Sequence, residues 1–246
     1  MKNTHELEDD LRERWLKSYP DDERKAFCFD GLCYNGEIYN DGKNAHQGNE
    51  EKLWNNTDRR ILFLMKDTNN NSDSDYREWH WRNINHNFFN CIFKWLEGLS
   101  RISKDFIPTM ENGDYATVPN AVVTKYPLAI VNIKKISGTS FVSNKTLYEY
   151  ANRDKAFLQE QIRGILHPNI IVCGGGKGTV LNIAKNIIYE DESFREINYF
   201  CHYSRKLNIL LIDSFHPSAI NSYWKIEDMM LKVHEFILET DPPFMK

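Results

Sequence analysis

The sequence predicts an α/β protein, a three-layer α/β/α sandwich with a central four-stranded parallel sheet. Two observations lead to this fold. Four short apolar runs are spread along the chain, each continuous enough for a strand that is covered on both faces. Segments with helical periodicity separate these runs, so strands and helices alternate, as they do in parallel sheets between helix layers.

Composition favours one core rather than several. The chain has 246 residues, of which 41% are hydrophobic, enough to bury one substantial core. We therefore predict a domain at residues 57–246, with an amino-terminal helix and irregular extension, residues 1–56, packed on it. The 31 basic and 35 acidic residues give a net charge of −4, so a nucleic-acid partner would need a locally basic face.

Cysteine usage and hydropathy bear on the cell compartment. The five cysteines are scattered and follow no apolar signal segment, which favours a reducing cytoplasm. No apolar stretch approaches the roughly 20 residues that cross a bilayer, so we expect no membrane contact. Cys28 and Cys33 flank a turn without further ligands at zinc spacing, and we predict no metal site.

The elements follow in a regular order. Leu7, Leu11 and Trp15 recur at helical spacing, whereas residues 28–56 are rich in turn-forming pairs and predict an irregular segment. The predicted strands are 61–65, 128–133, 167–173 and 207–212. The predicted helices after them are 87–102, 144–166, 174–189 and 223–238.

Residues suited to chemistry stand at the ends of three predicted strands. Asp67 follows the first strand, Asn132 lies at the end of the second, and His216 follows the fourth. Because parallel strands open their carboxyl ends onto one edge, where α/β proteins bind ligands, we expect these three side chains in one cleft.

The segments around these residues resemble the uracil-DNA glycosylase superfamily. They are ILFLMKDTN at 61–69, VNIKK at 131–135, IIVCGGGKGT at 170–179 and FHPSA at 215–219. The resemblance covers about residues 59–238, and its most specific element is the HPS triplet after the last strand. It implies hydrolysis of the N-glycosidic bond of a deaminated or modified base in nucleic acid, DNA more than RNA, with no metal or organic cofactor.

The resemblance assigns a role to each strand-end residue. Asp67 takes the place of the water-activating carboxylate, His216 that of the residue that stabilises the leaving base, and Asn132 that of the amide that recognises the base edge. This set suits the chemistry, because base loss builds positive charge on the sugar and negative charge on the base. An aromatic residue that stacks on the extruded base is Tyr76, Trp79 or Phe88.

Other residues would contact nucleic acid. The predicted basic rim at the sheet edge consists of Lys66, Lys134, Lys135 and Lys177. Ser218 would add a neutral phosphate contact, and Ile220 or Tyr223 would fill the vacated stack in the duplex.

The sequence also departs from the superfamily pattern. Met65, Thr68 and Ala219 stand where a glycine and two prolines are typical, which leaves the identity of the base open. GGGKGT lacks the spacing of a phosphate-binding P-loop, and close helix packing explains its glycines better.

Alternative functions remain alongside the enzyme. Asp67 could cap a turn, His216 could be structural, and Asn132 could bond the backbone. The protein could then be a catalytically inactive module that binds nucleic acid or a nucleotide, or a structural or regulatory protein of the same fold. The sequence does not identify protein partners.

Overall fold

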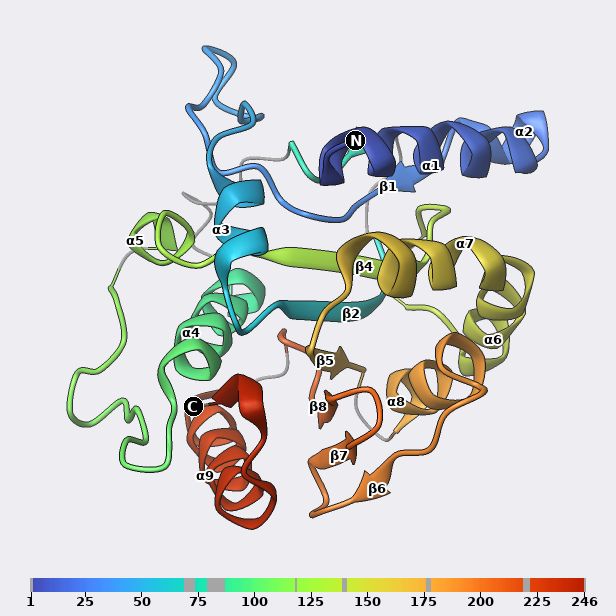
Figure 1. Cartoon of the computed structure of the whole chain (residues 1–246). Coiled ribbons are helices and arrows are strands. Elements are labelled where there is room, and N and C mark those ends of the chain that lie inside the picture. The colour runs from blue at the N-terminus through green and yellow to red at the C-terminus, as the bar shows by residue number, and fades with distance from the viewer. Residues whose placement is uncertain are drawn as a thin grey trace.

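The computed structural model of the chain describes residues 2–68, 74–78, 87–117, 119–138, 141–175, 178–218 and 222–245, without the side chains of residues 87, 119 and 222–225. A central sheet has the strand order β4-β2-β5-β8-β7-β6, and β1 and β3 pair separately (Figure 1). In chain order the strands are β1 (Cys28–Phe29), β2 (Ile61–Asp67), β3 (Ser74–Asp75), β4 (Ala129–Lys134), β5 (Ile170–Gly174), β6 (Arg195–Glu196), β7 (Cys201–Ser204) and β8 (Ile209–Ser214).

The four predicted parallel strands are confirmed as β2, β4, β5 and β8. The prediction of a four-stranded sheet is corrected, because β7 and β6 add two antiparallel strands beside β8. A tight turn through residues 205–208 joins β7 to β8, and Asn208 in it has a φ of 57°. Asparagine tolerates this left-handed conformation, which suits a hairpin connection.

The helices are α1 (Thr4–Ser18), α2 (Asp21–Arg24), α3 (Glu50–Asn56), α4 (Asn87–Arg101), α5 (Pro119–Val123), α6 (Asn144–Arg153), α7 (Lys155–Gln159), α8 (Thr179–Ile183) and α9 (Ser222–Thr240), with the π-helices η1 (Glu160–Leu166) and η2 (Ala184–Ile188) and the 3₁₀-helix η3 (Pro243–Met245). The predicted helix at 144–166 is thus divided at Asp154 into α6 and the α7–η1 segment. Within the described ranges, no helix has the length and apolar character to span a membrane.

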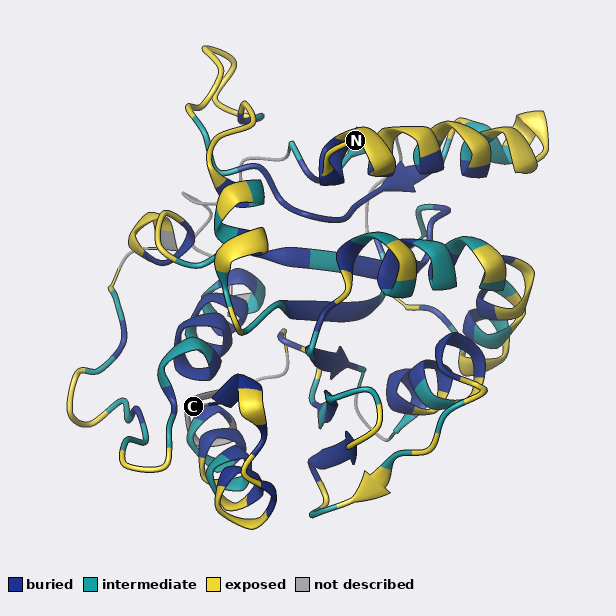
Figure 2. Cartoon of the chain, viewed as in Figure 1, coloured by how far each residue is buried: buried dark blue, intermediate teal, exposed yellow. Residues whose placement is uncertain are grey.

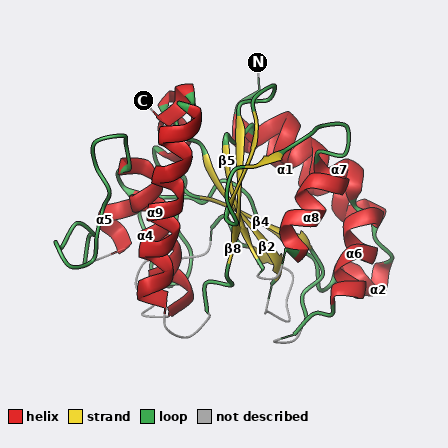
Figure 3. Ribbon diagram, turned by 90° about the horizontal axis from the view of Figure 1, so that it is seen from below, coloured by secondary structure: helices red, strands yellow, loops and turns green. Residues whose placement is uncertain are grey.

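Two hydrophobic clusters cover the two faces of the sheet. Seen edge-on, the sheet lies between α4 and α9 on one side and α6, α7 and α8 on the other (Figure 3). Alternate residues of β2 enter different clusters: Phe63 packs on the α4 and α9 side, and Leu62 and Leu64 pack on the other. Most residues of the central strands are buried, but β6 is exposed, and the other exposed residues lie mainly on the outer helices and loops (Figure 2).

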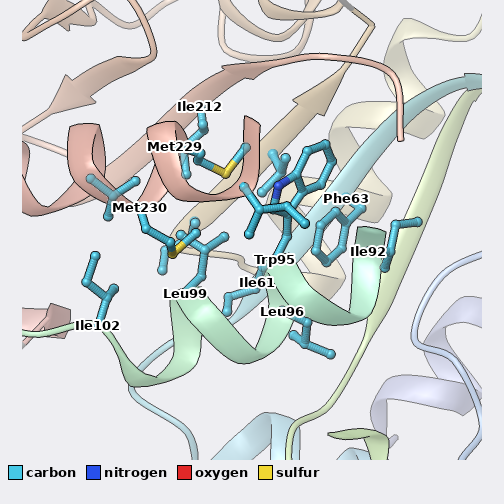
Figure 4. Packing of buried hydrophobic residues seen from close by; sticks show 14 of the residues in the cluster. Ile61, Phe63, Ile92, Trp95, Leu96, Leu99, Ile102, Ile212, Met229 and Met230 are labelled. Carbon is cyan, nitrogen blue, oxygen red and sulfur yellow. The ribbon is translucent and has the colours of Figure 1, made fainter. Parts of the chain in front are cut away.

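Large apolar side chains fill the first cluster. Phe63 and Trp95 stack with ring centroids 6.5 Å apart, and Met229 and Met230 of α9 pack opposite α4 (Figure 4). Burial of a side chain of the size of Phe63 contributes about 1.5–3 kcal/mol. This packing fixes α4 and α9 against the sheet, and so fixes the residues at the start of α4.

The amino-terminal extension is more ordered than predicted, because residues 28–56 contain β1 and α3. Residues 26–33 run along the free edge of β4, where the Cys28 N–H donates to Lys135 O at 2.7 Å and the Ile130 N–H donates to Gly31 O at 2.9 Å. Trp15 of α1 is buried in the same cluster as the strands. The extension therefore completes one face of the core.

Candidate active site at the carboxyl edge of the sheet

The carboxyl ends of β2, β5 and β8 bring several chemically useful residues to one edge. Asp67 ends β2, Gly174 ends β5 between them, and His216 follows the end of β8 by two residues. A Cβ atom on Gly174 would lie only 2.4 Å from Met65 Sδ and 3.6 Å from Pro217 Cδ. The glycine therefore lets Met65 lie across the end of β5, between the Asp67 and His216 strands.

The residues at this edge, called the edge site, are Asp67, Thr68, Phe88, Lys134, Asp213, Ser214 and His216.

Asp67 is a carboxylate held just below the surface. Its side chain is 13% exposed, and its Oδ2 lies 3.7 Å from Lys134 Nζ, its register partner on β4. Burial raises the pKa of Asp67, and the positive charges of Lys134 and Lys66 oppose that rise. The aspartate thus depends on a neighbouring lysine for its charge balance.

Lys134 is equally enclosed. Its side chain is 8% exposed, its ammonium donates to Ile136 O, and its Nζ lies 5.3 Å from the centre of the Tyr150 ring. Burial lowers the pKa of Lys134, and Asp67 opposes that shift. A Cβ on Gly138 would stand 2.8 Å from Asp67 Oδ2 and 3.0 Å from Lys134 Nζ, so a glycine is needed beside the pair.

The hydrogen bonding of His216 defines which of its ring nitrogens carries the proton. Its Nδ1 accepts a hydrogen bond from the Ser218 N–H at 3.2 Å. The residue is exposed to solvent on one side, whereas the protein around its ring desolvates it and, with the charge of Lys66, lowers its pKa. At neutral pH the imidazole is therefore uncharged, and because Nδ1 is an acceptor the proton stands on Nε2.

Four buried oxygens at the ends of β2 and β8 have no hydrogen-bond partner among the described residues. They are Asp67 Oδ2, Thr68 Oγ1, Asp213 Oδ1 and Ser214 Oγ. Thr68 is 4% exposed and Ser214 is 2% exposed, so water reaches neither side chain freely. Since buried polar atoms are nearly always paired, this concentration at one edge is the feature expected where a polar ligand completes the bonding.

Asn132 has a different environment from the one predicted. It is 7% exposed, its Nδ2 donates to Asp30 Oδ2 at 2.9 Å, and its backbone N–H donates to the same oxygen at 3.0 Å. The amide is thus engaged with the segment that covers the edge of β4. Its recognition of a base stays a prediction.

The predicted basic rim is corrected at two positions. Lys135 is fully buried and donates to Asp30 and Gln161, and Lys134 is paired with Asp67. Both charges are used inside the protein, because a buried ammonium needs an anionic partner. Lys66 is half-buried, and its Cε would lie 3.2 Å from a Cβ on Gly175.

Of the predicted aromatic residues, Phe88 lies nearest to the histidine. Its ring is 5.6 Å from the His216 ring, at the start of α4. Tyr76 lies elsewhere, beside β1, where its N–H donates to Phe29 O at 2.8 Å. Ser218 is exposed and contacts His216 through its N–H. Trp79, Lys177, Ile220 and the side chain of Tyr223 lie outside the described residues.

Sequence reasoning missed several residues of this edge. Asp213 and Ser214 end the apolar run of β8. Two polar residues at the end of an apolar strand could have indicated them as candidates for the site. Burial raises the pKa of Asp213, whose carboxylate also accepts a hydrogen bond from the Gly178 N–H.

The glycines between β5 and α8 have structural reasons. Gly178 has a φ of 71° and precedes α8. A Cβ on Gly175 would lie 2.4 Å from Val180 Cγ2. Close packing therefore explains Gly175, as predicted, whereas the left-handed backbone conformation explains Gly178.

Within the described part of the chain, no group of three or more His, Cys, Asp or Glu side chains is arranged to hold a metal ion. Comparison with known proteins finds no protein-family model and no curated protein that matches this chain. The edge site is therefore the basis for the proposed function.

Proposed function

We propose that this protein is a base N-glycosylase of the uracil-DNA glycosylase type, which hydrolyses the bond between a deaminated or modified base and its sugar in DNA. The main support is the set of unpartnered buried oxygens at the ends of β2 and β8, the strands that lead to Asp67 and His216. An extruded nucleotide offers polar atoms along its sugar and base, and these could complete the missing hydrogen bonds.

His216 is the residue proposed to stabilise the leaving base. Its Nε2–H is a neutral donor, because the Ser218 N–H holds Nδ1 as an acceptor and the lowered pKa keeps the ring uncharged. Such a donor stabilises the negative charge that develops on a base oxygen as the glycosidic bond breaks. Phe88, 5.6 Å away, supplies an aromatic surface for the base to stack on.

Asp67 is the residue proposed to act on the sugar. As a carboxylate it stabilises positive charge on the sugar ring and orients the attacking water near C1′. Lys134 at 3.7 Å favours the ionised form of this partly desolvated group. Lys66 and the exposed Ser218 are the described residues proposed to contact phosphates, and Lys177, Ile220 and Tyr223 complete the proposed DNA contacts.

The cysteines agree with a reducing compartment such as the cytoplasm. All five are buried thiols without a disulfide. We therefore place the proposed activity there.

The test is base release from duplexes that carry uracil or another altered base. We expect release by the wild-type protein and a loss of about 10²–10⁴-fold in Asp67→Asn and His216→Ala. The matched controls are Asp22→Asn and His46→Ala, which change exposed residues outside the edge site and should keep full activity. Full activity in the two edge-site variants would refute the assigned roles.

A second candidate is a binding module without catalysis. The engagement of Asn132 with Asp30 favours it, because the proposed base-recognising amide is already hydrogen bonded. This function predicts salt-dependent binding of DNA without release of a base. Turnover with any altered base would exclude it.

A further inference from the structure

Lys134 has an environment that base excision alone does not require. Its amine is buried to 8% exposure, 3.7 Å from an aspartate oxygen that has no hydrogen-bond partner among the described residues. A lysine that served only to hold a phosphate would keep its ammonium in water, where it is well solvated. Lys134 instead holds its amine inside the protein, where it donates to Ile136 O and lies 3.7 Å from the carboxylate proposed to face the sugar.

The proposed excision reaction would leave a reactive carbon next to this amine. Asp67 acts at C1′ of the nucleotide, and after the base departs, C1′ of the ring-opened abasic sugar is an aldehyde. Since Lys134 Nζ is within 3.7 Å of Asp67 Oδ2, a sugar that contacts Asp67 also comes within reach of the amine. Gly138 has no side chain to intrude on the pair.

We propose that Lys134 forms an imine with the aldehyde of an abasic site bound in the edge site. This inference rests on the proposed function for the placement of the sugar. It adds a covalent step to the product of excision, and it assigns to Lys134 a catalytic role instead of phosphate binding.

The step balances without a further reactant. The neutral amine adds to C1′, a proton moves from nitrogen to oxygen, and the resulting carbinolamine loses its hydroxyl as water. The product is a C1′=Nζ bond plus one water molecule. Asp67 would accept the proton that frees the amine and later donate it to the departing hydroxyl.

The electrostatics of Lys134 and Asp67 support proton transfer between them. Burial lowers the pKa of Lys134 and raises the pKa of Asp67, so both shifts favour movement of a proton from the ammonium to the carboxylate. Tyr150 lies 5.3 Å from Nζ and adds one aromatic wall. Lysines that form imines are typically desolvated in this way.

The experiment uses a duplex with a preformed abasic site, so that no excision is needed. The full-length protein and the duplex are mixed with sodium borohydride, which reduces an imine to a stable secondary amine. We expect a covalent protein–DNA product, with Lys134 as the modified residue when the digested product is analysed by mass spectrometry.

Two variants test the assignment. Lys134→Arg keeps the positive charge beside Asp67 but has no primary amine, and it should reduce the trapped product at least about tenfold. Lys17→Arg is the matched control, because Lys17 is an exposed lysine of α1 outside the edge site, and it should trap normally. Thermal unfolding of both variants shows whether they are folded.

The outcomes separate this inference from the proposed function. Absence of a trapped product with wild-type protein that releases bases would overturn the imine and leave the glycosylase standing. A product attached to another lysine or to the amino terminus would also overturn it. Trapping at Lys134 in a protein that releases none of the tested bases would support the imine while arguing against excision.

Discussion

Two polar regions beside the central sheet have opposite hydrogen-bonding states. Around Asp30, the side chains of Asn132, Lys135 and Gln161 are buried, and the Asp30 carboxylate accepts from Asn132 and Lys135. The Gln161 amide donates to Asp30 O at 2.6 Å. At the edge site, by contrast, four buried oxygens have no partner in the described part of the chain.

This difference separates a structural role from a binding role. A satisfied buried network holds one conformation and leaves nothing for a ligand to bond. Unsatisfied buried atoms cost stability, and a protein retains them where another molecule supplies the partner. The Asp30 cluster therefore fastens the amino-terminal extension to the sheet, whereas the edge site is where ligand chemistry is expected.

The largest expected effect is on the Asp30 cluster. Lys135→Met leaves the Asp30 carboxylate buried without its cation, and we expect it to lower the free energy of unfolding by about 3–5 kcal/mol. Urea unfolding measures the change. The double variant Asp30→Asn, Lys135→Met removes both charges and should recover part of the loss, whereas equal losses in both proteins would show that the charge pair is not the cause.

The next largest expected effect is on how the free energy of unfolding depends on pH, and it arises from His5 in α1. His5 of α1 lies 2.9 Å from Glu50, and despite its burial the neighbouring carboxylates of Glu50 and Glu8 raise its pKa to about 9. Because the folded pKa exceeds the ordinary value of 6.5, the stabilisation is fully present below pH 6.5 and is lost as pH rises through about 9.

We expect this titration to change the free energy of unfolding by roughly 2–3 kcal/mol between pH 6.5 and pH 9.5. The His5→Gln variant should lack most of that dependence when both proteins are unfolded in urea over this pH range. An identical pH profile for the variant would show that another group is responsible.

The smallest effect on stability is expected at the edge site. Ser214→Ala removes a buried hydroxyl without a hydrogen-bond partner among the described residues, so unfolding should change by less than about 1 kcal/mol, in either direction. Binding of an abasic duplex, measured by fluorescence anisotropy, should nevertheless weaken. A large loss of stability would mean that Ser214 has a structural bond.

The parallel strands could be predicted from the sequence because each is a continuous apolar run. The run at 61–65 is β2 with two polar residues added at its end, and Asp67 could be placed at the sheet edge for the same reason. Strands β6 and β7 were missed because they are short and β6 is exposed.

Long-range polar pairing explains the contacts that could not be predicted from the sequence. Lys135 looks like a surface lysine in the sequence, and its burial depends on Asp30, which lies 105 positions earlier in the chain. Asn132 likewise meets Asp30 across 102 positions. Local patterns do not contain such partners, so the engaged amide and the buried lysine could be found only from the structure.

The most direct test of the edge site is a crystal structure with a duplex that contains a non-cleavable 2′-fluoro analogue of an altered deoxynucleotide. We expect the extruded base against Phe88 with its edge at His216 Nε2, and the sugar facing Asp67, with ligand atoms or bound water within hydrogen-bond distance of Asp67 Oδ2 and Ser214 Oγ. A duplex bound at another surface, with these two oxygens bonded to the protein's own residues, would contradict the assignment of this edge as the active site.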